Sequence, residues 1–244
     1  MTSSVAAIIV AAGDSRRLPG AELKQWRLLG GQPLVLYALR FFDEHPAVDQ
    51  IVVAVDDESL RRPDRLRLLE SRHGKPVRAT PGGSFRQQTV WLALQTLQGE
   101  PELVLIHDAA RPFPSAEGVE MCLSAAREVG GAILALPVAE TIKRATGNGE
   151  VARTIDRDSL WAAQTPQVFC YRRLMAAYQV FETELERFTD DAGIFEAHGG
   201  RVRLVMGTDA NFKITTPEDF ARAERRIADC GLRIAECTMR NDGL

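Results

Sequence analysis

A group of cations follows the first apolar run of the chain, and residues of this kind handle phosphate. The run Val5–Val10 has the composition of a buried strand. The residues after it are first small and then basic: Ala11, Ala12 and Gly13, then Arg16, Arg17 and Lys24. Small residues let backbone N–H groups approach an anion closely, and cations neutralise its charge. A strand that ends in such a loop is typical of phosphate binding.

The loop matches neither of the common nucleotide-binding sequences. A Walker loop requires Gly-x-x-x-x-Gly-Lys-Ser/Thr, and the dinucleotide fingerprint requires Gly-x-Gly-x-x-Gly; the sequence contains neither. A basic surface loop has the same composition, so the loop alone leaves both interpretations open. Motifs at neighbouring strand ends are needed to choose between them.

The composition limits what the whole chain can be. Its 244 residues suffice for one large α/β domain, and we expect a single domain over residues 1–244. The formal net charge of −3 excludes nucleic-acid binding driven by overall charge, so an anion site must be local. The first residues carry no basic segment, and no apolar run approaches about 18 residues, so we expect neither a signal peptide nor a membrane span.

The cysteines indicate a reducing compartment. The sequence has four of them, at Cys122, Cys170, Cys230 and Cys237. Their spacings match no zinc or redox motif. We therefore expect reduced thiols in a cytoplasmic protein.

Segments of strand and helix composition alternate along the chain. The predicted strands are Val5–Val10, Gln50–Val55, Val77–Ala79, Leu103–His107, Ala132–Pro137 and Val202–Val205. The predicted helices are Pro33–Phe42, Ser84–Leu97, Ser115–Val129 and Pro217–Ala235. Two helix starts are marked by sequence, a Ser at a cap position and Thr-Pro-Glu-Asp. This alternation predicts a Rossmann-like, doubly wound and mostly parallel sheet, which binds ligands beyond the carboxyl ends of its strands.

A paired-glycine motif follows the third predicted strand. Gly82 and Gly83 precede a helix and allow a ligand to approach the backbone closely. Ser84 and Thr89 follow the glycines and could also contact the ligand. Alternatively, Ser84 is only a helix N-cap and Thr89 is only a helix-surface residue.

An acidic motif follows the fourth predicted strand, in the segment His107 to Pro112. Asp108 at a strand end is well placed to meet a metal–phosphate complex. Pairing with Arg111, or a cap, would also account for this carboxylate. Three such motifs at one edge of a sheet together favour a ligand site.

An insertion over residues 139–157 has the pattern of a hairpin. Asn148-Gly149 is typical of a type I′ turn, and a turn centred there places Thr141 opposite Asp156. Arg157 then lies beside Thr141 at the base of the arm. A two-stranded ribbon is marginally stable alone, so we expect it to pack on a second chain; the alternative is a mobile flap.

With these motifs placed, the chain resembles the 2-C-methyl-D-erythritol 4-phosphate cytidylyltransferase (IspD) family over roughly residues 5 to 230. The matching segments are Ala11-Ala12-Gly13, Arg17, Lys24-Gln25, Gly82-Gly83, Arg86, His107 to Pro112, Pro137-Val138, Thr141, Lys143-Arg144, Asp156-Arg157, Leu160-Trp161, Gln164 to Phe169, Thr189 to Ala192 and Asn211 to Asp219. The resemblance implies a Rossmann-like fold whose β-arm joins two subunits into a homodimer.

The resemblance also implies a reaction in isoprenoid precursor biosynthesis. CTP and 2-C-methyl-D-erythritol 4-phosphate would give 4-diphosphocytidyl-2-C-methyl-D-erythritol and pyrophosphate, with Mg²⁺ as cofactor. The attacking phosphate is already an oxyanion, so the transition state at the α-phosphorus needs fixed cations and no general base. The abundance of Arg and Lys in the motifs agrees with this chemistry.

Particular residues receive roles from the resemblance. It implies that Arg17 and Lys24 stabilise the transition state, and that Arg157 and Lys213 hold the attacking phosphate. Asp108 would lie at the metal–triphosphate end. The substrate-binding positions that it implies are Ala11, Ala12, Gly13, Gly82, Gly83, Arg86, Thr89, Asp108, Ala109, Arg111, Thr141 and Thr215.

Four positions depart from the family pattern, and two rival functions stay open. The family commonly has Gly, Met and Pro where this chain has Ser15, Leu18 and Leu23, and often Ser where it has Gly193. Loss of the proline predicts a more mobile segment from Asp14 to Leu23 before CTP binds. One rival is a cytidylyltransferase for another polyol phosphate, such as ribitol 5-phosphate; the other is a non-catalytic nucleotide-binding protein.

Overall fold

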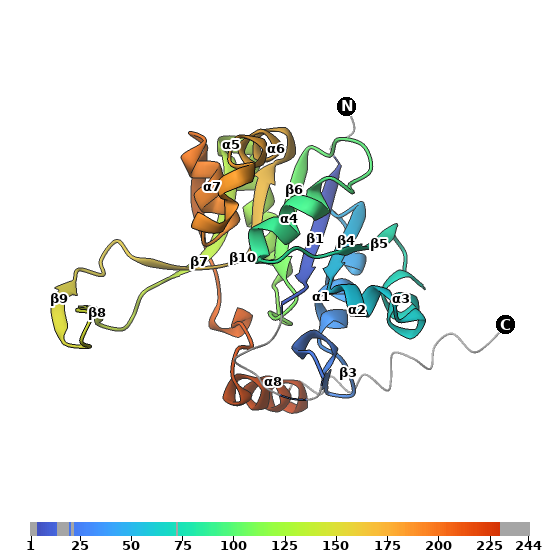
Figure 1. Ribbon diagram of the computed structural model, residues 1–244, viewed down its shortest axis with the longest axis horizontal. Helices are drawn as coiled ribbons and strands as arrows, with labels where there is room; N and C mark the ends of the chain where they lie inside the picture. Colours follow the sequence, from blue (N-terminus) through green and yellow to red (C-terminus); the bar gives the residue numbers. More distant parts are fainter. Residues whose placement is uncertain (1–3, 14–19, 21, 72, 230–244) are drawn as a thin grey trace.

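A seven-stranded sheet forms the centre of the computed structural model, which describes residues 4–13, 20, 22–71 and 73–229. The strand order is β11-β7-β10-β6-β1-β4-β5 (Figure 1). The strands are β1 (Val5–Ala11), β4 (Gln50–Val55), β5 (Val77–Pro81), β6 (Leu103–Asp108), β7 (Gly130–Pro137), β10 (Trp161–Cys170) and β11 (Arg201–Met206). β10 pairs antiparallel with β6 and β7, and the other pairs in the sheet are parallel.

Helices cover both faces of this sheet, so its central strands are buried on both sides. They are α1 (Val35–Glu44), α2 (Asp57–Leu60), α3 (Pro63–Glu70), α4 (Arg86–Leu94), α5 (Ala116–Val129), α6 (Tyr171–Val180), α7 (Asp191–Ala197) and α8 (Pro217–Asp229), with short 3₁₀ turns η1 (Lys24–Trp26), η2 (Glu182–Arg187) and η3 (Asp209–Asn211). Side chains of α1 and α5 pack in one core layer, and those of α4, α6 and α7 pack in the other. Runs of Val, Ile and Ala in β1 and β4 suit strands that meet apolar layers on both faces.

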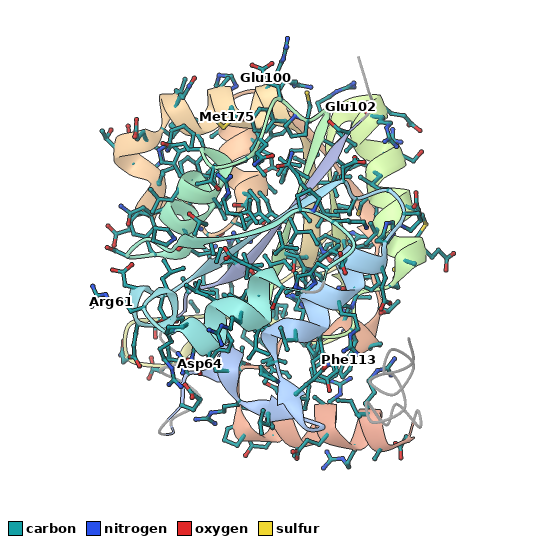
Figure 2. All side chains as sticks on the ribbon, turned by 90° about the vertical axis from the view of Figure 1, so that its right-hand side faces the viewer. Arg61, Asp64, Glu100, Glu102, Phe113 and Met175 are labelled. Carbon is teal, nitrogen blue, oxygen red and sulfur yellow. The ribbon has the colours of Figure 1, made fainter. Side chains whose placement is uncertain are left out.

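Side chains fill the space between the sheet and its helices (Figure 2). The labelled Arg61 and Glu100 are exposed and extend outward at the edge of that view. No helix of the described part of the chain is long and apolar enough to cross a membrane. Cys122 and Cys170 are free thiols.

The predicted doubly wound, mostly parallel sheet is confirmed, and each of the six predicted strands coincides with a strand of the structure. The Ser115 cap is confirmed as well, because its side chain accepts the Gly118 N–H at 3.1 Å. At α8, Thr216 and Asp219 exchange hydrogen bonds in the manner of a capping box.

The predicted start of the first helix is wrong. Pro33 lies in β3 (Gln32–Pro33), which pairs with β2 (Leu28–Leu29), and α1 begins at Val35. The turn between these strands uses positive φ angles at Gly30 and Gly31, which only glycine adopts readily. Proline is favoured in the first turn of a helix, but here Pro33 belongs to the hairpin strand that precedes the helix.

The predicted arm is present as β8 (Ile142–Ala145) and β9 (Val151–Ile155), and it extends away from the body of the molecule (Figure 1). Ile142 faces Ile155, as the predicted pairing requires. The predicted position of the turn is wrong by one residue. The turn runs from Thr146 to Gly149, where the Gly149 N–H donates to the Thr146 carbonyl at 3.1 Å and Gly149 has a φ of +83°. The register shifts between Arg144 and Ala145, and Ala152 on the opposite strand is the extra residue.

We predict that Leu105→Ala lowers the free energy of unfolding by about 2–5 kcal/mol. Leu105 lies in the middle of β6 and is fully buried, so its removal leaves a cavity that the two-sided core cannot close. Urea titration should show the loss. Leu68→Ala on α3, where the side chain is 46% exposed, is the control and should change stability little. Equal losses for the two variants would contradict the described core.

Candidate active site

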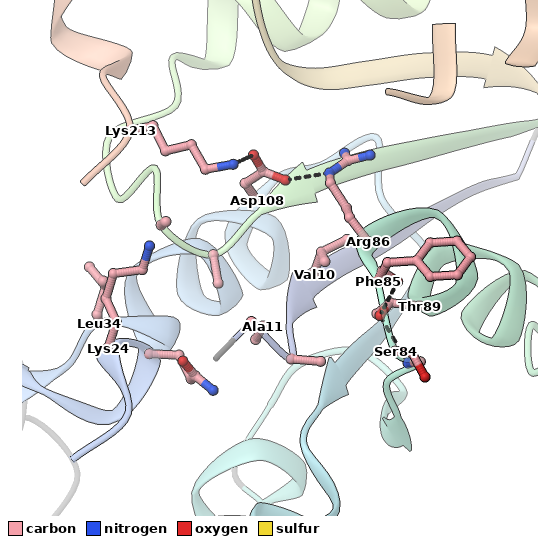
Figure 3. Close-up of a pocket in the computed structure, with 16 residues that line it drawn as sticks. Val10, Ala11, Lys24, Leu34, Ser84, Phe85, Arg86, Thr89, Asp108 and Lys213 are labelled. Carbon is pink, nitrogen blue, oxygen red and sulfur yellow. Dashed lines mark hydrogen bonds and ion pairs between the residues drawn. The ribbon is translucent and has the colours of Figure 1, made fainter. Parts of the chain in front are cut away.

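A cavity of about 450 Å³ opens at the carboxyl ends of β1, β5 and β6, where the three sequence motifs were predicted to meet (Figure 3). Its lining residues are Val10, Ala11, Ala12, Gly13, Lys24, Gln25, Leu34, Gly83, Ser84, Phe85, Arg86, Thr89, Asp108, Ala109, Ala110 and Lys213. Parallel pairing of β6, β1, β4 and β5 brings these strand ends to one edge.

Gly83 lines one wall of the cavity, and Gly82 packs closely against the first loop. A Cβ atom at Gly82 would lie 2.1 Å from the Ala12 side chain, so a larger residue would push the first loop away. The Gly83 N–H donates to Thr89 Oγ1 at 2.9 Å. Thr89 is buried, so the alternative of a helix-surface residue is wrong. Ser84 is not the helix cap either, because α4 begins after Phe85.

Asp108 is held between two cations at the centre of the cavity. Lys213 Nζ lies 2.7 Å from Oδ2, and Arg86 Nε lies 3.0 Å from Oδ1 (Figure 3). Burial alone would raise the pKa of Asp108, but Arg86 and Lys213 outweigh it and hold that pKa well below its usual range. The carboxylate is therefore ionised at neutral pH. The alternative partner, Arg111, instead donates from Nη1 to the Asn211 carbonyl at 2.7 Å.

Arg86 also pairs with a second carboxylate, that of Asp191. Asp191 was not predicted as a site residue and was named only within a segment that matches the family. Arg86 Nη1 lies 2.8 Å from Asp191 Oδ2, an ion pair outside hydrogen-bond geometry. Asp191 is fully buried and accepts a hydrogen bond of 2.6 Å from the Tyr178 hydroxyl. Burial opposes the charge on Arg86, but Asp191 and Asp108 raise its pKa, so it stays cationic. The signal available in sequence was the segment Thr189 to Ala192, which matches the family and contains this carboxylate.

His107 and Thr165 hold the backbone at Asp108. The Thr165 hydroxyl accepts the Asp108 N–H at 3.0 Å and lies 3.2 Å from His107 Nδ1. His107 Nε2 is 2.9 Å from the Arg111 carbonyl, which fixes a tautomer with the proton on Nε2 and an accepting Nδ1. Burial lowers the pKa of His107 to about 4, so the ring is neutral near neutral pH.

Two lysines from opposite ends of the chain meet at the cavity. Lys24 lies at the start of η1, and its Nζ donates to the Ile214 carbonyl at 2.9 Å. That carbonyl directly follows Lys213, so the two ammonium groups lie on the same side of the cavity (Figure 3). Thr215 is nearby, but its hydroxyl donates to Asp219 at 2.7 Å and neither cavity lining contains it.

A second cavity of about 230 Å³ adjoins the first and shares Arg86, Asp108 and Lys213 with it. Its other lining residues are Arg111, Ala163, Gln164, Thr165, Gln167, Thr189 and Asp190. Of these, only Arg111 was predicted as a site residue. The others come from β10, which was not predicted as a strand, and from the segment before α7.

Of the predicted site residues, Gly82, Thr215, Thr141 and Arg157 line neither of the two cavities. Arg17 lies outside the described residues, as does most of the segment Asp14 to Leu23 whose mobility was predicted. Thr141 and Arg157 are exposed on the arm, and Arg157 Nη1 donates to the Ala139 carbonyl. Neither Thr141 nor Arg157 is among the lining residues of the two cavities.

Leu23 keeps a backbone that a proline could adopt. Its φ is −60°, the angle that a proline ring imposes, and its N–H donates to Glu22 Oε1 at 3.0 Å. In this chain a hydrogen bond therefore restrains the position at which the family commonly has proline.

Comparison with known proteins gives one family. The model of the 2-C-methyl-D-erythritol 4-phosphate cytidylyltransferase family matches residues 5–229. A curated relative from Bacillus licheniformis with that name is 40% identical over 220 residues, covering 89% of this chain and 93% of the relative. A relative of the same name from Symbiobacterium thermophilum is also 40% identical, covering 90% and 91%.

Solved structures agree with this assignment. The enzyme of that name from Thermus thermophilus is 31% identical, with a TM-score of 0.74, covering 92% of this chain and 99% of that chain. A 4-diphosphocytidyl-2C-methyl-D-erythritol synthase from Anaerococcus prevotii is 28% identical, with a TM-score of 0.80, covering 93% and 96%. The chain belongs to the 2-C-methyl-D-erythritol 4-phosphate cytidylyltransferase family.

Proposed function

We propose that the two adjoining cavities join CTP to 2-C-methyl-D-erythritol 4-phosphate, giving 4-diphosphocytidyl-2-C-methyl-D-erythritol and pyrophosphate for isoprenoid precursor biosynthesis. This cytidylyl transfer is the activity of the family to which the chain belongs. The observation that carries the proposal is the shared wall of Arg86, Asp108 and Lys213. Two anionic substrates could meet there beside fixed cations.

The larger cavity suits the nucleotide. Backbone of Ala11, Ala12 and Gly13 and the loop at Gly83 form walls without bulky side chains, which suits a planar base and a ribose. Lys24 lies on the opposite side, where the triphosphate would extend from the ribose. We assign the base and ribose to the side of Gly83 and Thr89, and the phosphates to the side of Lys24.

The smaller cavity suits the polyol phosphate. Arg111 and Lys213 offer cations for its phosphate, while Gln164, Thr165 and Thr189 offer neutral polar groups for its hydroxyls. An oxygen of that phosphate would attack the α-phosphorus of CTP. The new P–O bond forms while the bond to the β-phosphate oxygen breaks, and pyrophosphate leaves with the electron pair. Lys24 and Arg17 would stabilise the extra charge that develops at the α-phosphorus.

The carboxylate of Asp108 fits a divalent cation that arrives with the nucleotide. Each Asp108 oxygen accepts one contact from Arg86 or Lys213, and a carboxylate has roughly four acceptor positions, so capacity is left. The described ranges contain no group of three acidic, His or Cys side chains that could hold a metal alone. Mg²⁺ suits such a site because it takes substrate phosphates and one or two carboxylates as ligands. Bound there, it would neutralise charge on the triphosphate.

We further propose that the arm joins two copies of the chain and completes the acceptor site. Ile142, Val151 and Ile155 cannot be buried by a two-stranded ribbon alone, and Val151 is 62% exposed. A two-fold dimer would place each arm on the partner. Thr141 and Arg157 would then lie at the partner's polyol-phosphate cavity, to which a cation such as Arg157 would add a charge-assisted contact.

An assay of pyrophosphate release tests the reaction and the role of Lys24 together. With CTP and Mg²⁺, we expect the wild-type chain to turn over 2-C-methyl-D-erythritol 4-phosphate much faster than ribitol 5-phosphate. Lys24→Ala should lower kcat by roughly 10²–10³, the effect of losing one fixed donor to a developing charge, with a smaller change in CTP affinity. A near-normal kcat would remove Lys24 from the chemistry. No CTP-dependent release by the wild-type chain would leave only the non-catalytic alternative.

Asp108→Asn should raise the Mg²⁺ concentration needed for half-maximal activity, because the substitution keeps the shape and removes the charge that attracts the ion. Asp191→Asn is the matched control. It also removes a carboxylate paired with Arg86, but Asp191 is fully buried and lines neither cavity. If the Mg²⁺ concentration for half-maximal activity changed by the same amount in both variants, or in neither, Asp108 would serve only to hold Arg86 and Lys213.

A mixing experiment tests whether Arg157 acts in the partner's site. Lys24→Ala and Arg157→Ala each damage both sites of a homodimer. A mixed dimer would contain one site with both residues intact, because Lys24 and Arg157 come from different chains. Activity should therefore rise after the two variants are unfolded and refolded together, and light scattering should give a dimer mass. No gain from a dimeric mixture would place the two residues in the same chain's site.

A further inference from the structure

Arg65, a buried residue outside both cavities, is the centre of a network that holds the segment that carries Lys24. Arg65 on α3 is only 4% exposed, and its guanidinium lies 4.7 Å from the centre of the Trp26 ring. Nη1 donates to Ser59 Oγ at 2.9 Å, and Nη2 donates to Glu22 Oε1 at 2.6 Å. One side chain therefore contacts residues on both sides of Lys24.

The contacts before Lys24 converge on Glu22. Its Oε1 accepts both Arg65 Nη2 and the Leu23 N–H, the latter at 3.0 Å. Leu23 directly precedes Lys24. Arg65 is thus linked through one carboxylate oxygen to the backbone next to the lysine.

The contacts after Lys24 converge on Ser59. Trp26 Nε1 donates to Ser59 Oγ at 2.7 Å, and that hydroxyl donates to Asp56 Oδ2 at 2.6 Å. Together with the Arg65 contact, these use the one donor and two acceptor positions of the hydroxyl. Gln25 Nε2 also reaches Asp56 Oδ2, at 3.2 Å. The side chains of residues 22, 25 and 26 are therefore tied to α2, α3 and the cap before them, while Lys24 lines the cavity.

We propose that Arg65 is a positioning residue that acts through this network to hold Lys24 at the reacting phosphate, an inference that rests on the proposed function. The planar fork of an arginine meets two acceptors while its face stacks on an aromatic ring, which a lysine cannot do. Small displacements of a catalytic group lower rates steeply, by about 10²-fold for 1 Å. The acceptors of the Arg65 guanidinium, Ser59 and Glu22, line neither cavity, so its effect must pass through the Lys24 segment.

The test compares Arg65→Met with Arg67→Met in the pyrophosphate-release assay. Arg67 lies on the same helix with an exposed side chain, so its substitution should leave kcat unchanged. Arg65→Met should lower kcat by roughly 10–10²-fold, with much smaller changes in the KM of either substrate. Arg65→Lys keeps the charge without the fork and should restore only part of the rate.

A second comparison separates positioning from a general loss of structure. In a Lys24→Ala background, Arg65→Met should lower kcat little further, because the group that it positions is already absent. The proposal would be overturned if the double variant lost kcat by the full product of the two single losses. A folded Arg65→Met variant with wild-type kcat would overturn it as well. If Arg65→Met does not fold, Glu22→Gln decides by the same two comparisons, since the Glu22 side chain is 45% exposed. A near-normal kcat for Lys24→Ala alone would instead refute the role assigned to Lys24, and this proposal with it.

Discussion

The ion pairs of Asp108 are the interaction on which the rest of the site depends. One carboxylate, 6% exposed at the end of a central strand, binds Arg86 from α4 and Lys213 from the segment before α8. A buried charge without partners costs roughly several kcal/mol, so the Asp108 carboxylate depends on its two cations. The two cavities share this cluster as their common wall. Any rearrangement that separated its members would therefore disturb both proposed substrate sites.

Fixed cations suit the proposed reaction better than acid–base groups would. Transfer of the cytidylyl group from CTP to a phosphate oxyanion needs stabilisation of charge that appears only in the transition state, and preorganised donors supply it without reorganisation. Residues outside the cavities hold the side chains around the site in place. Asp191 and Tyr178 support Arg86, while Glu22, Ser59 and Trp26 surround Arg65 next to the Lys24 segment. Supporting groups of this kind keep long, flexible side chains in one orientation.

The topology explains how one edge of the sheet can carry so much charge. Parallel pairing of β1, β4, β5 and β6 places four strand ends together. The cavity there receives backbone from the loops, Asp108 from the end of β6 and Arg86 from the start of α4. The antiparallel strand β10 lies beside β6 and adds Thr165 and Gln167 to the second cavity. The third core cluster, formed by Leu29, Leu34, Ile214, Ala223 and Ile227, joins the β2–β3 hairpin to α8. That packing brings Lys24 and Lys213 together from distant parts of the chain.

The sequence by itself determined the features that depend on neighbouring residues. Apolar runs predicted the parallel strands, Ser115 and Thr216 marked helix starts, and the small residues after β1 and around Gly82 predicted loops whose backbone a ligand can approach closely. Only the tertiary structure decided which charges meet. Asp108 pairs with Arg86 and Lys213 and not with the nearby Arg111, Asp191 supports Arg86, and β10 runs against its neighbours. Sequence spacing within one element fixes direction and face, but contacts between elements depend on how the whole core packs, which no local pattern encodes.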